Sequence, residues 1–247
     1  MKPRASYSLL RPALLFAALV AVTFWPYLIG DRTYLPSDMH DTMMAPFEAS
    51  HHGGVAQNHY FNDGITQTYP YKLQTQEALR RGTLAYWNPY ILGGYPEYAE
   101  TLADNFDPFN VILLWMPVKL AIPWQIALQM LLTGIGMLLL LRRLGISLAV
   151  NVLFSGAFML NSLFIATAAC RWATATFCWV PFLTIALLDL LERRRLLDLG
   201  NASLALALSF LGGNFQSSFY VSILVALILL FGPSCLLYTS PSPRDGL

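Results

Sequence analysis

Charged side chains are scarce in this sequence. Asp, Glu, Lys and Arg make up 12% of the 247 residues, whereas a soluble domain carries about 25%. Hydrophobic residues make up 56%, and the mean hydropathy is +0.51. These values exclude an ordinary soluble domain and indicate an integral membrane protein. The net charge of +1 gives no sign of a nucleic-acid partner.

Cysteine and the common catalytic motifs are also lacking. The three cysteines have neither the number nor the spacing of a disulfide framework or a metal site. The sequence contains no P-loop, Rossmann fingerprint, HExxH or GxSxG, so soluble nucleotide and protease chemistries have no support. The four histidines lie in one loop and not on facing helices, which argues against electron-transfer ligation.

The last residues read CLLYTSPSPRDGL. We interpret residues 235–247 as an artefact tail, because Cys235 to Asp245 matches the in-frame translation of a sequencing-library adapter. The alternative is a natural polar terminus. Such segments are set apart from fold reasoning. On this interpretation we expect an N-terminal fragment of a longer protein, and we expect the fragment to be inactive because its bundle is incomplete.

Long apolar runs are what the sequence has in abundance. Residues 1–30 predict a first transmembrane helix, since the run 12–29 approaches the roughly 20 residues that cross a bilayer. No A-x-A cleavage site follows it, so we expect it to stay uncleaved. Residues 108–234 predict an interfacial helix, over PFNVILLWMPV, followed by transmembrane helices 2 to 6. The expected spans cover 123–141, 146–168 and 173–191, and then a less regular pair interrupted by a polar break at GGNFQSS.

Positive charges gather at one set of helix ends. Lys2, Arg4, Arg11, Arg142, Arg143 and Arg193 to Arg195 fall on the same side if the spans are as drawn. Basic residues mark the cytoplasmic side, so we expect a cytoplasmic N-terminus. The first loop, 31–107, then lies outside the cell membrane. The fold class predicted is an all-α polytopic membrane protein with a long, structured first extracytoplasmic loop.

That loop holds all four histidines and ten of the fourteen acidic residues. Within it, QTYPYKLQTQEALRRG predicts one helix, with Pro70 in its first turn and Gly82 as its stop. An aromatic and proline-rich segment follows, GTLAYWNPYILGG, in which Asn88-Pro89 and Gly93-Gly94 are turn signals.

Several of these segments together resemble the bacterial YfhO family, polytopic membrane proteins grouped with the GT-C glycosyltransferases. They are "NDGITQTYP", "ALRRGTLAYWNPYILGGYPEYAE", "NFDPFNVILLWMP", "LLLLRRLGIS", "CWVPFLTIALLDLLERRR" and "LGGNFQSSFY". The resemblance covers residues 1–234, and its most specific element is G-x-L-x-x-WNP-x-x-x-GG. Family members often carry His where this chain has Asn214, so no imidazole role transfers to that position.

The resemblance implies a GT-C-like helix bundle in the bacterial inner membrane. It also implies an enzyme that moves a sugar from a polyprenyl-phosphate carrier to a cell-envelope glycan or lipid acceptor on the outer face. The acceptor hydroxyl needs a carboxylate base within hydrogen-bond reach, and the departing phosphate needs cationic or amide donors. No cofactor is required by this chemistry, although a divalent metal is compatible with it. The expected partners are membrane lipid and a lipid-linked sugar.

Two carboxylates are candidates for the catalytic base. GT-C enzymes usually carry their catalytic acidic residue in the first external loop, which favours Asp63. The alternative for Asp63 is an Asn-Asp-Gly turn in which the carboxylate satisfies backbone donors. Asp38 is the rival base. Asp104 and Asp107 flank a junction between loop and helix and are interpreted as N-caps.

Other polar and aromatic residues are candidates for substrate binding, each with a structural alternative. Arg80 and Arg81 suit a carrier phosphate or a solvated helix end. Arg171 suits a phosphate contact, because a charge at the outer interface is costly unless it is paired, or a snorkelling position. Trp87 and Tyr90 suit a sugar-stacking wall or membrane-interface anchors. Asn88, Asn214 and Gln216 complete the set. The histidines (His40, His51, His52, His59) lack a metal-binding register, and we interpret them as surface residues.

Two other functions fit the same layout. A flippase or transporter of lipid-linked glycans would also need a membrane bundle, but ion-coupled transport usually needs ionisable groups inside the spans, and there are almost none. A non-catalytic membrane scaffold is the third candidate.

Overall fold

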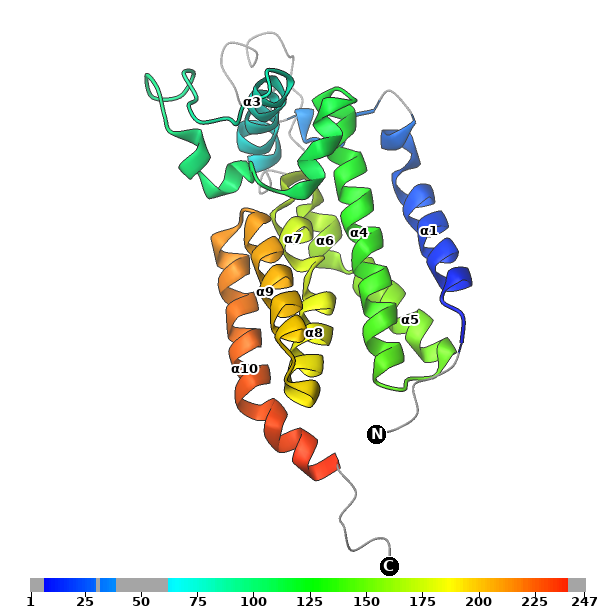
Figure 1. Ribbon diagram of the computed structural model, residues 1–247. Coiled ribbons are helices and arrows are strands. Elements are labelled where there is room, and N and C mark those ends of the chain that lie inside the picture. The colour runs from blue at the N-terminus through cyan, green and yellow to red at the C-terminus, as the bar shows by residue number, and fades with distance from the viewer. Residues whose placement is uncertain (1–6, 30–31, 39–61, 240–247) are drawn as a thin grey trace, which may run out of the picture.

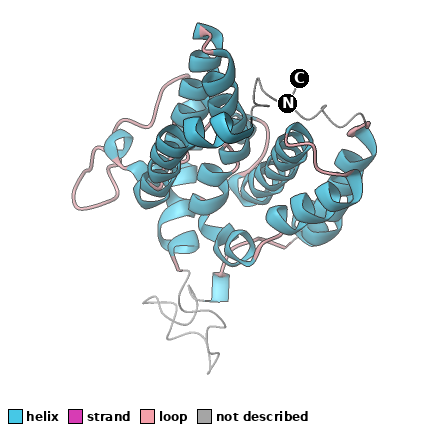
Figure 2. Ribbon diagram, turned by 90° about the horizontal axis from the view of Figure 1, so that it is seen from below, coloured by secondary structure: helices cyan, strands magenta, loops and turns pink. Residues whose placement is uncertain are grey.

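The computed structural model describes residues 7–29, 32–38 and 62–239, and these residues form helices and connecting loops (Figure 1). Extended backbone pairs only at one isolated bridge within the described residues, Asn88 with Tyr95. The view along the bundle in Figure 2 shows helices packed side by side. The expected all-α architecture is confirmed at this level.

Five helical stretches among the described residues are long and apolar enough to cross a membrane. They are Leu10–Leu28, Val118–Arg143, Leu148–Cys170, Trp172–Arg193 and Phe215–Gly232. The apolar helix Leu196–Leu211 is shorter. The helical elements of the bundle are α1 (Leu10–Leu28), α4 (Val118–Arg143), α5 (Leu148–Met159), α6 (Ser162–Thr167), η7 (Ala168–Cys170), α7 (Trp172–Phe177), α8 (Val180–Arg193), α9 (Leu196–Leu211) and α10 (Phe215–Thr239). These helices are compatible with a helical membrane protein.

The third and fourth apolar stretches are broken helices and not the continuous spans that the sequence predicted. α5 ends at Met159, and Asn161 caps α6 by accepting a hydrogen bond from the Phe164 N–H at 3.0 Å. α7 ends at Phe177, and α8 starts with Pro181 in its first turn, where the missing N–H costs nothing. Asn161 and Pro181 thus set boundaries that hydropathy alone does not reveal.

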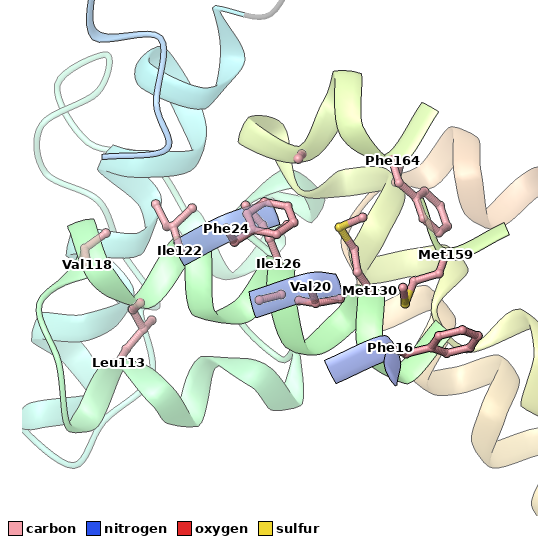
Figure 3. Close-up of a cluster of buried hydrophobic side chains, with 14 of the residues drawn as sticks. Phe16, Val20, Phe24, Leu113, Val118, Ile122, Ile126, Met130, Met159 and Phe164 are labelled. Carbon is pink, nitrogen blue, oxygen red and sulfur yellow. The ribbon is translucent and has the colours of Figure 1, made fainter. Parts of the chain in front are cut away.

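Close packing through small residues holds α1 against the bundle. Phe16, Val20 and Phe24 recur every four residues on α1 and lie against α4, as Figure 3 shows. A Cβ added to Gly134 of α4 would lie 2.9 Å from the Phe16 Cδ2 of α1 and 2.7 Å from the Met159 Sδ of α5. Glycine at this point lets the helices approach, which is how membrane helices gain packing energy in the absence of a hydrophobic driving force.

A compact polar region, residues 62–117, sits on the end of the bundle where α4 begins, and we call it the cap (Figure 1). Its helical elements are the π-helix η3 (Gly64–Thr68), α3 (Tyr69–Arg80), and the 3-10 helices η4 (Glu97–Ala99), η5 (Thr101–Ala103) and η6 (Pro108–Leu114). The predicted loop helix is confirmed as α3, with Pro70 in its first turn and Gly82 at a φ of +71°. The interfacial helix expected from residue 108 is the short η6.

The opposite end of the bundle carries the arginine-rich helix ends. Arg143 at the end of α4 pairs with Asp189 at 2.8 Å and with Glu192 at 3.0 Å on α8. α3 begins beside the bundle, where the Thr68 hydroxyl donates to the Cys170 carbonyl at 3.3 Å, and runs away from it (Figure 1). The cap and the arginine-rich ends are therefore separated by the length of the bundle.

Candidate functional site at the junction of cap and bundle

Four charged side chains meet where the cap rests on the bundle. Arg171, between η7 and α7, donates from Nη1 to Asp104 Oδ2 at 2.9 Å and from Nη2 to Asp107 Oδ2 at 2.6 Å. The Lys72 Nζ of α3 contacts the second oxygen of Asp104. We call these four residues the ionic cluster. Its two cations and two carboxylates neutralise one another, which a buried cluster requires because each isolated charge would cost several kcal/mol to bury.

The ionic cluster is closed off from solvent. Arg171 and Lys72 are each 1% exposed. This finding excludes the snorkelling alternative for Arg171, whose guanidinium is held inside by two carboxylates and does not reach a lipid headgroup. Burial lowers the pKa of Lys72 to about 8, although the Asp104 carboxylate opposes that shift. Burial also raises the pKa of Asp107, which Arg171 counteracts.

Neutral side chains from three elements surround the ionic cluster. Asn110 accepts from Lys72 Nζ through Oδ1 at 2.6 Å and donates through Nδ2 to the Asp104 carbonyl at 2.7 Å. Gln129 of α4 donates to Asp107 Oδ2 at 3.0 Å and accepts from the Thr174 hydroxyl at 3.0 Å. These bonds restrain the side chains of the cluster, although the buried Nε of Arg171 has no hydrogen-bond partner among the described residues.

Backbone strain coincides with the ion pairs. Asp104 has a φ of +42° and Arg171 a φ of +60°, and only four non-glycine residues in the described ranges have positive φ. Such conformations cost about 1–3 kcal/mol each and cluster at functional sites. Asp104 was expected to be an N-cap, and that expectation is wrong: the residue ends η5 in a left-handed conformation, and its carboxylate faces Lys72 and Arg171. Asp107 does cap η6, through a 3.0 Å bond from the Phe109 N–H, besides pairing with Arg171.

Asp63 lies next to the ionic cluster. A cavity of about 20 Å³ is lined by Asp63, Gln67, Thr68, Leu102, Asp104, Cys170, Trp172, Gly212 and Gly213. This volume holds about one water molecule. Asp63 is half-buried, and its Oδ1 accepts from Gln67 Nε2 at 3.3 Å. It begins the π-helix η3 without a side-chain bond to the helix backbone, so its carboxylate does not serve as the backbone cap that the turn alternative required. Short π-helical segments are frequent at functional sites.

The polar break between α9 and α10 completes this junction through its glycines. A Cβ added to Gly213, whose φ is +86°, would overlap the Thr101 carbonyl and lie 2.7 Å from the Asp104 Cβ. Asn214 accepts from the Ser217 N–H at 2.7 Å and thereby caps α10. Gln216 is exposed and donates to the Tyr220 hydroxyl at 2.7 Å. Asn214 and Gln216, which were predicted to bind substrate, do not line the cavity beside Asp63. Gly212 and Gly213 of the same break do.

Most of the remaining predicted binding residues line a cleft of about 610 Å³ that runs along α3. Its lining residues are Pro70, Leu73, Gln74, Gln76, Glu77, Arg80, Arg81, Asn88, Tyr90 and Ile91. Arg81 pairs with Glu77, four residues earlier on the same exposed helix face. Tyr90 is 81% exposed. The Trp87 ring covers Gly94, where no Cβ would fit.

Asn88 organises the aromatic segment. Its Nδ2 donates to Glu97 Oε2 at 2.6 Å, and its Oδ1 accepts from the Tyr90 N–H at 2.9 Å. Burial raises the pKa of Glu97 to about 7, although the bond from Asn88 opposes the shift. Asn88 is itself buried, so it shapes the loop from within.

The predicted site residues therefore divide into two groups. Asp63 and Arg80 are 17 positions apart at the two ends of η3 and α3, and helical rise separates them by roughly 25 Å. A phosphate held by Arg80 or Arg81 would lie far from the Asp63 carboxylate. Asp38 is half-buried in the segment after α1 and is not among the described residues lining the Asp63 cavity. The four histidines lie outside the described residues.

The site also contains residues that sequence reasoning did not select. Lys72, Asn110 and Gln129 were not predicted, although Gln125 and Gln129 stand four apart in an otherwise apolar helix and are fully buried. The four-residue spacing of the two glutamines could have indicated a buried polar site, since buried amides in a membrane span need hydrogen-bond partners. No group of three or more potential metal ligands occurs in the described part of the chain. No family model, curated protein or solved structure matches this chain.

Proposed function

We propose that this chain belongs to a membrane glycosyltransferase of the GT-C type, which transfers a sugar from a polyprenyl-phosphate carrier to an extracytoplasmic acceptor. The observation that carries the proposal is the position of Asp63, a half-buried carboxylate at the junction of cap and bundle, beside a strained and rigid ionic cluster. Rigid support of a reacting group is what catalysis requires of a scaffold. The sequence resemblance to the YfhO family supports the same class.

Charge placement supports an outward-facing site. The arginine-rich ends of α4 and α8 lie away from the cap. Basic helix ends face the cytoplasm, which directs the cap and Asp63 to the outer side of a bacterial cytoplasmic membrane. A lipid carrier in the outer leaflet would then meet Asp63 near the membrane surface.

In the proposed reaction Asp63 accepts the proton of the acceptor hydroxyl as its oxygen attacks C1 of the sugar. The bond from C1 to the carrier phosphate breaks, and the polyprenyl phosphate leaves with the electron pair. Arg171 is internally neutralised and closed to solvent, so we assign it a positioning role and not the phosphate contact first expected. The small cavity admits water and not a sugar, so substrates must reach Asp63 from its exposed side.

The test measures transfer of a labelled hexose from a panel of synthetic polyprenyl-phosphate hexoses by membranes that contain this protein. Released polyprenyl phosphate is the second readout. We expect Asp63→Asn to reduce transfer by about 10²-fold or more, the usual contribution of a general base. Asp38→Asn is the matched control and should retain transfer. Both variants should insert and fold like the parent.

Two results would reject the assignment. If Asp63→Asn transfers sugar as well as the parent, Asp63 is not the base. If only Asp38→Asn loses transfer, Asp38 is the base. If no hexose is transferred and the protein instead moves a fluorescent lipid-linked glycan across vesicles irrespective of Asp63, the flippase alternative is correct. If neither Asp63→Asn nor Asp38→Asn changes sugar transfer or lipid movement, the non-catalytic scaffold is the function that fits.

A further inference from the structure

A groove of about 630 Å³ lies between α4, α8 and α9, toward the arginine-rich end of the bundle. Its walls are mainly apolar: Leu139, Trp179, Phe182, Ile185, Leu204 and Leu208. This volume falls in the range of about 300–1,000 Å³ that is typical of small-ligand sites. The groove shares no lining residue with the Asp63 cavity, so its ligand is independent of the proposed catalytic site.

Polar side chains gather at the end of the groove. Arg142, Arg143, Asp189 and Asn201 line it there. Arg143 is fixed by Asp189 through Nε at 3.1 Å and Nη2 at 2.8 Å. The guanidinium of Arg142 lies 5.6 Å from the centre of the Tyr7 ring. The Tyr7 hydroxyl is held in turn by Asn151 Nδ2 at 2.5 Å. Both arginines are thus positioned by side-chain contacts.

Positive charge exceeds negative charge around this end. Five arginines (Arg142, Arg143, Arg193, Arg194 and Arg195) and three carboxylates (Asp189, Glu192 and Asp198) lie at the end of α4, the end of α8 and the start of α9. Asp189 and Glu192 pair with Arg143, and Asp189 also pairs with Arg193, so the end as a whole keeps a net positive charge. An apolar helix laid over the groove, from a second copy or another segment, would bury Arg142 and Asn201 against hydrocarbon, which is costly in a membrane. A lipid avoids that cost, because its chains fill the apolar walls while its phosphate meets the arginines.

We propose that this groove binds one anionic phospholipid, with an acyl chain between α8 and α4 and the headgroup phosphate at Arg142 and Arg143. Basic pockets between membrane helices on the cytoplasmic side are suited to anionic headgroups. A zwitterionic lipid such as phosphatidylcholine offers the same chains and the same phosphate but adds a cationic choline group. The positive charge at this end disfavours that cation and so distinguishes the two lipids.

The experiment is native mass spectrometry of the 247-residue chain released from nanodiscs that contain equal amounts of phosphatidylglycerol and phosphatidylcholine. We expect one retained phosphatidylglycerol in preference to phosphatidylcholine. Arg142→Gln should reduce that preference about tenfold, since hydrogen bonds to charged groups contribute on this scale. Leu204→Trp should fill the groove from its lipid-exposed wall and reduce retention of both lipids. Leu204 is 59% exposed, so the larger ring does not disturb the packed interior.

Matched controls keep the outcome interpretable. Arg195→Gln removes an exposed charge from the same end outside the groove, and Leu199→Trp adds a ring to α9 outside it. Both should bind lipid like the parent, and circular dichroism should show equal helix content in all variants. Equal retention of the two lipids by the parent, unchanged retention in Leu204→Trp, or a dimer that Leu204→Trp dissociates would each overturn the proposal.

Discussion

Arg171 and Asp104 hold each other in place with both backbones in the left-handed region, joined by a 2.9 Å bond from Nη1 to Oδ2. Neither residue is glycine, so each conformation stores strain that the ion pair maintains. The pair also joins the cap to the bundle, since Asp104 follows η5 and Arg171 follows η7. Together with the bonds from Arg171 and Gln129 to Asp107, the pair holds the cap, and Asp63 with it, on the bundle.

Arg171→Gln should destabilise the protein by about 3–5 kcal/mol, because it leaves two buried carboxylates with Lys72 as their remaining cation. Thermal unfolding in detergent, compared with the exposed-charge variant Arg195→Gln, measures the effect. Combining Arg171→Gln with Asp107→Asn should recover part of the loss, since it removes one uncompensated charge. A change within about 0.5 kcal/mol, as for an ordinary surface substitution, would contradict the cluster's structural role.

Gly213→Ala should displace the α9–α10 turn from the cap. The added Cβ meets the Thr101 carbonyl and the Asp104 Cβ at a positive φ, and we expect a loss of about 2 kcal/mol or more. Gly200→Ala in α9 is the control, because nothing lies within 4 Å of its added Cβ. That change should stabilise α9 by roughly 0.5–1 kcal/mol through helix propensity. Equal unfolding temperatures for the two variants would refute the close approach.

The aromatic segment should loosen as pH rises from about 4.5 to 7. Burial raises the pKa of Glu97 from 4.5 to about 7, so the folded loop binds more protons than the unfolded chain in this window. The stability that protonated Glu97 contributes is complete below pH 4.5 and is lost as pH passes 7, with a magnitude on the order of 2 kcal/mol. Hydrogen exchange of residues 86–95 across this range measures it. In Glu97→Gln the dependence should vanish; its persistence would assign the titration to another group.

Asn88→Ala should disorganise the loop more than removal of the exposed aromatic ring beside it. The substitution removes the bonds to Glu97 and to the Tyr90 N–H and leaves the buried Glu97 carboxyl without its donor. The expected cost is about 1–3 kcal/mol. Tyr90→Ala is the control, since it keeps the backbone N–H that bonds Asn88. Limited proteolysis within 86–95 should be faster only in Asn88→Ala, and equal rates would refute the organising role.

Local signals were sufficient to predict much of the fold. Pro70 and Gly82 bounded α3 correctly because the chemistry of a helix start and stop is carried by single residues. The apolar runs predicted the spans because length and hydropathy are also local properties. The breaks at Asn161 and Pro181 were missed, since they interrupt runs that remain continuously hydrophobic.

The candidate site was only partly predictable because its partners are remote in sequence. Lys72 gave no sign of being buried, and nothing near Arg171 in the sequence identifies Asp104 as its partner. Most of the separation of Asp63 from Arg80 was accessible, since Asp63 precedes the start of the predicted helix and Arg80 lies near its end. Assembly of long-range polar contacts, in contrast, depends on how the whole bundle folds.

The ionic cluster sets an order of events during biogenesis. Lys72, Asp104 and Asp107 emerge from the ribosome well before Arg171, which stands about 100 residues after the lysine and beyond two apolar stretches. On the topology that we propose, this polar region is exported first and holds two carboxylates and one cation until the helix preceding Arg171 has entered the lipid. Nascent chains arrested before that arginine leaves the translocon should therefore expose this region to external protease, and chains arrested after it should not.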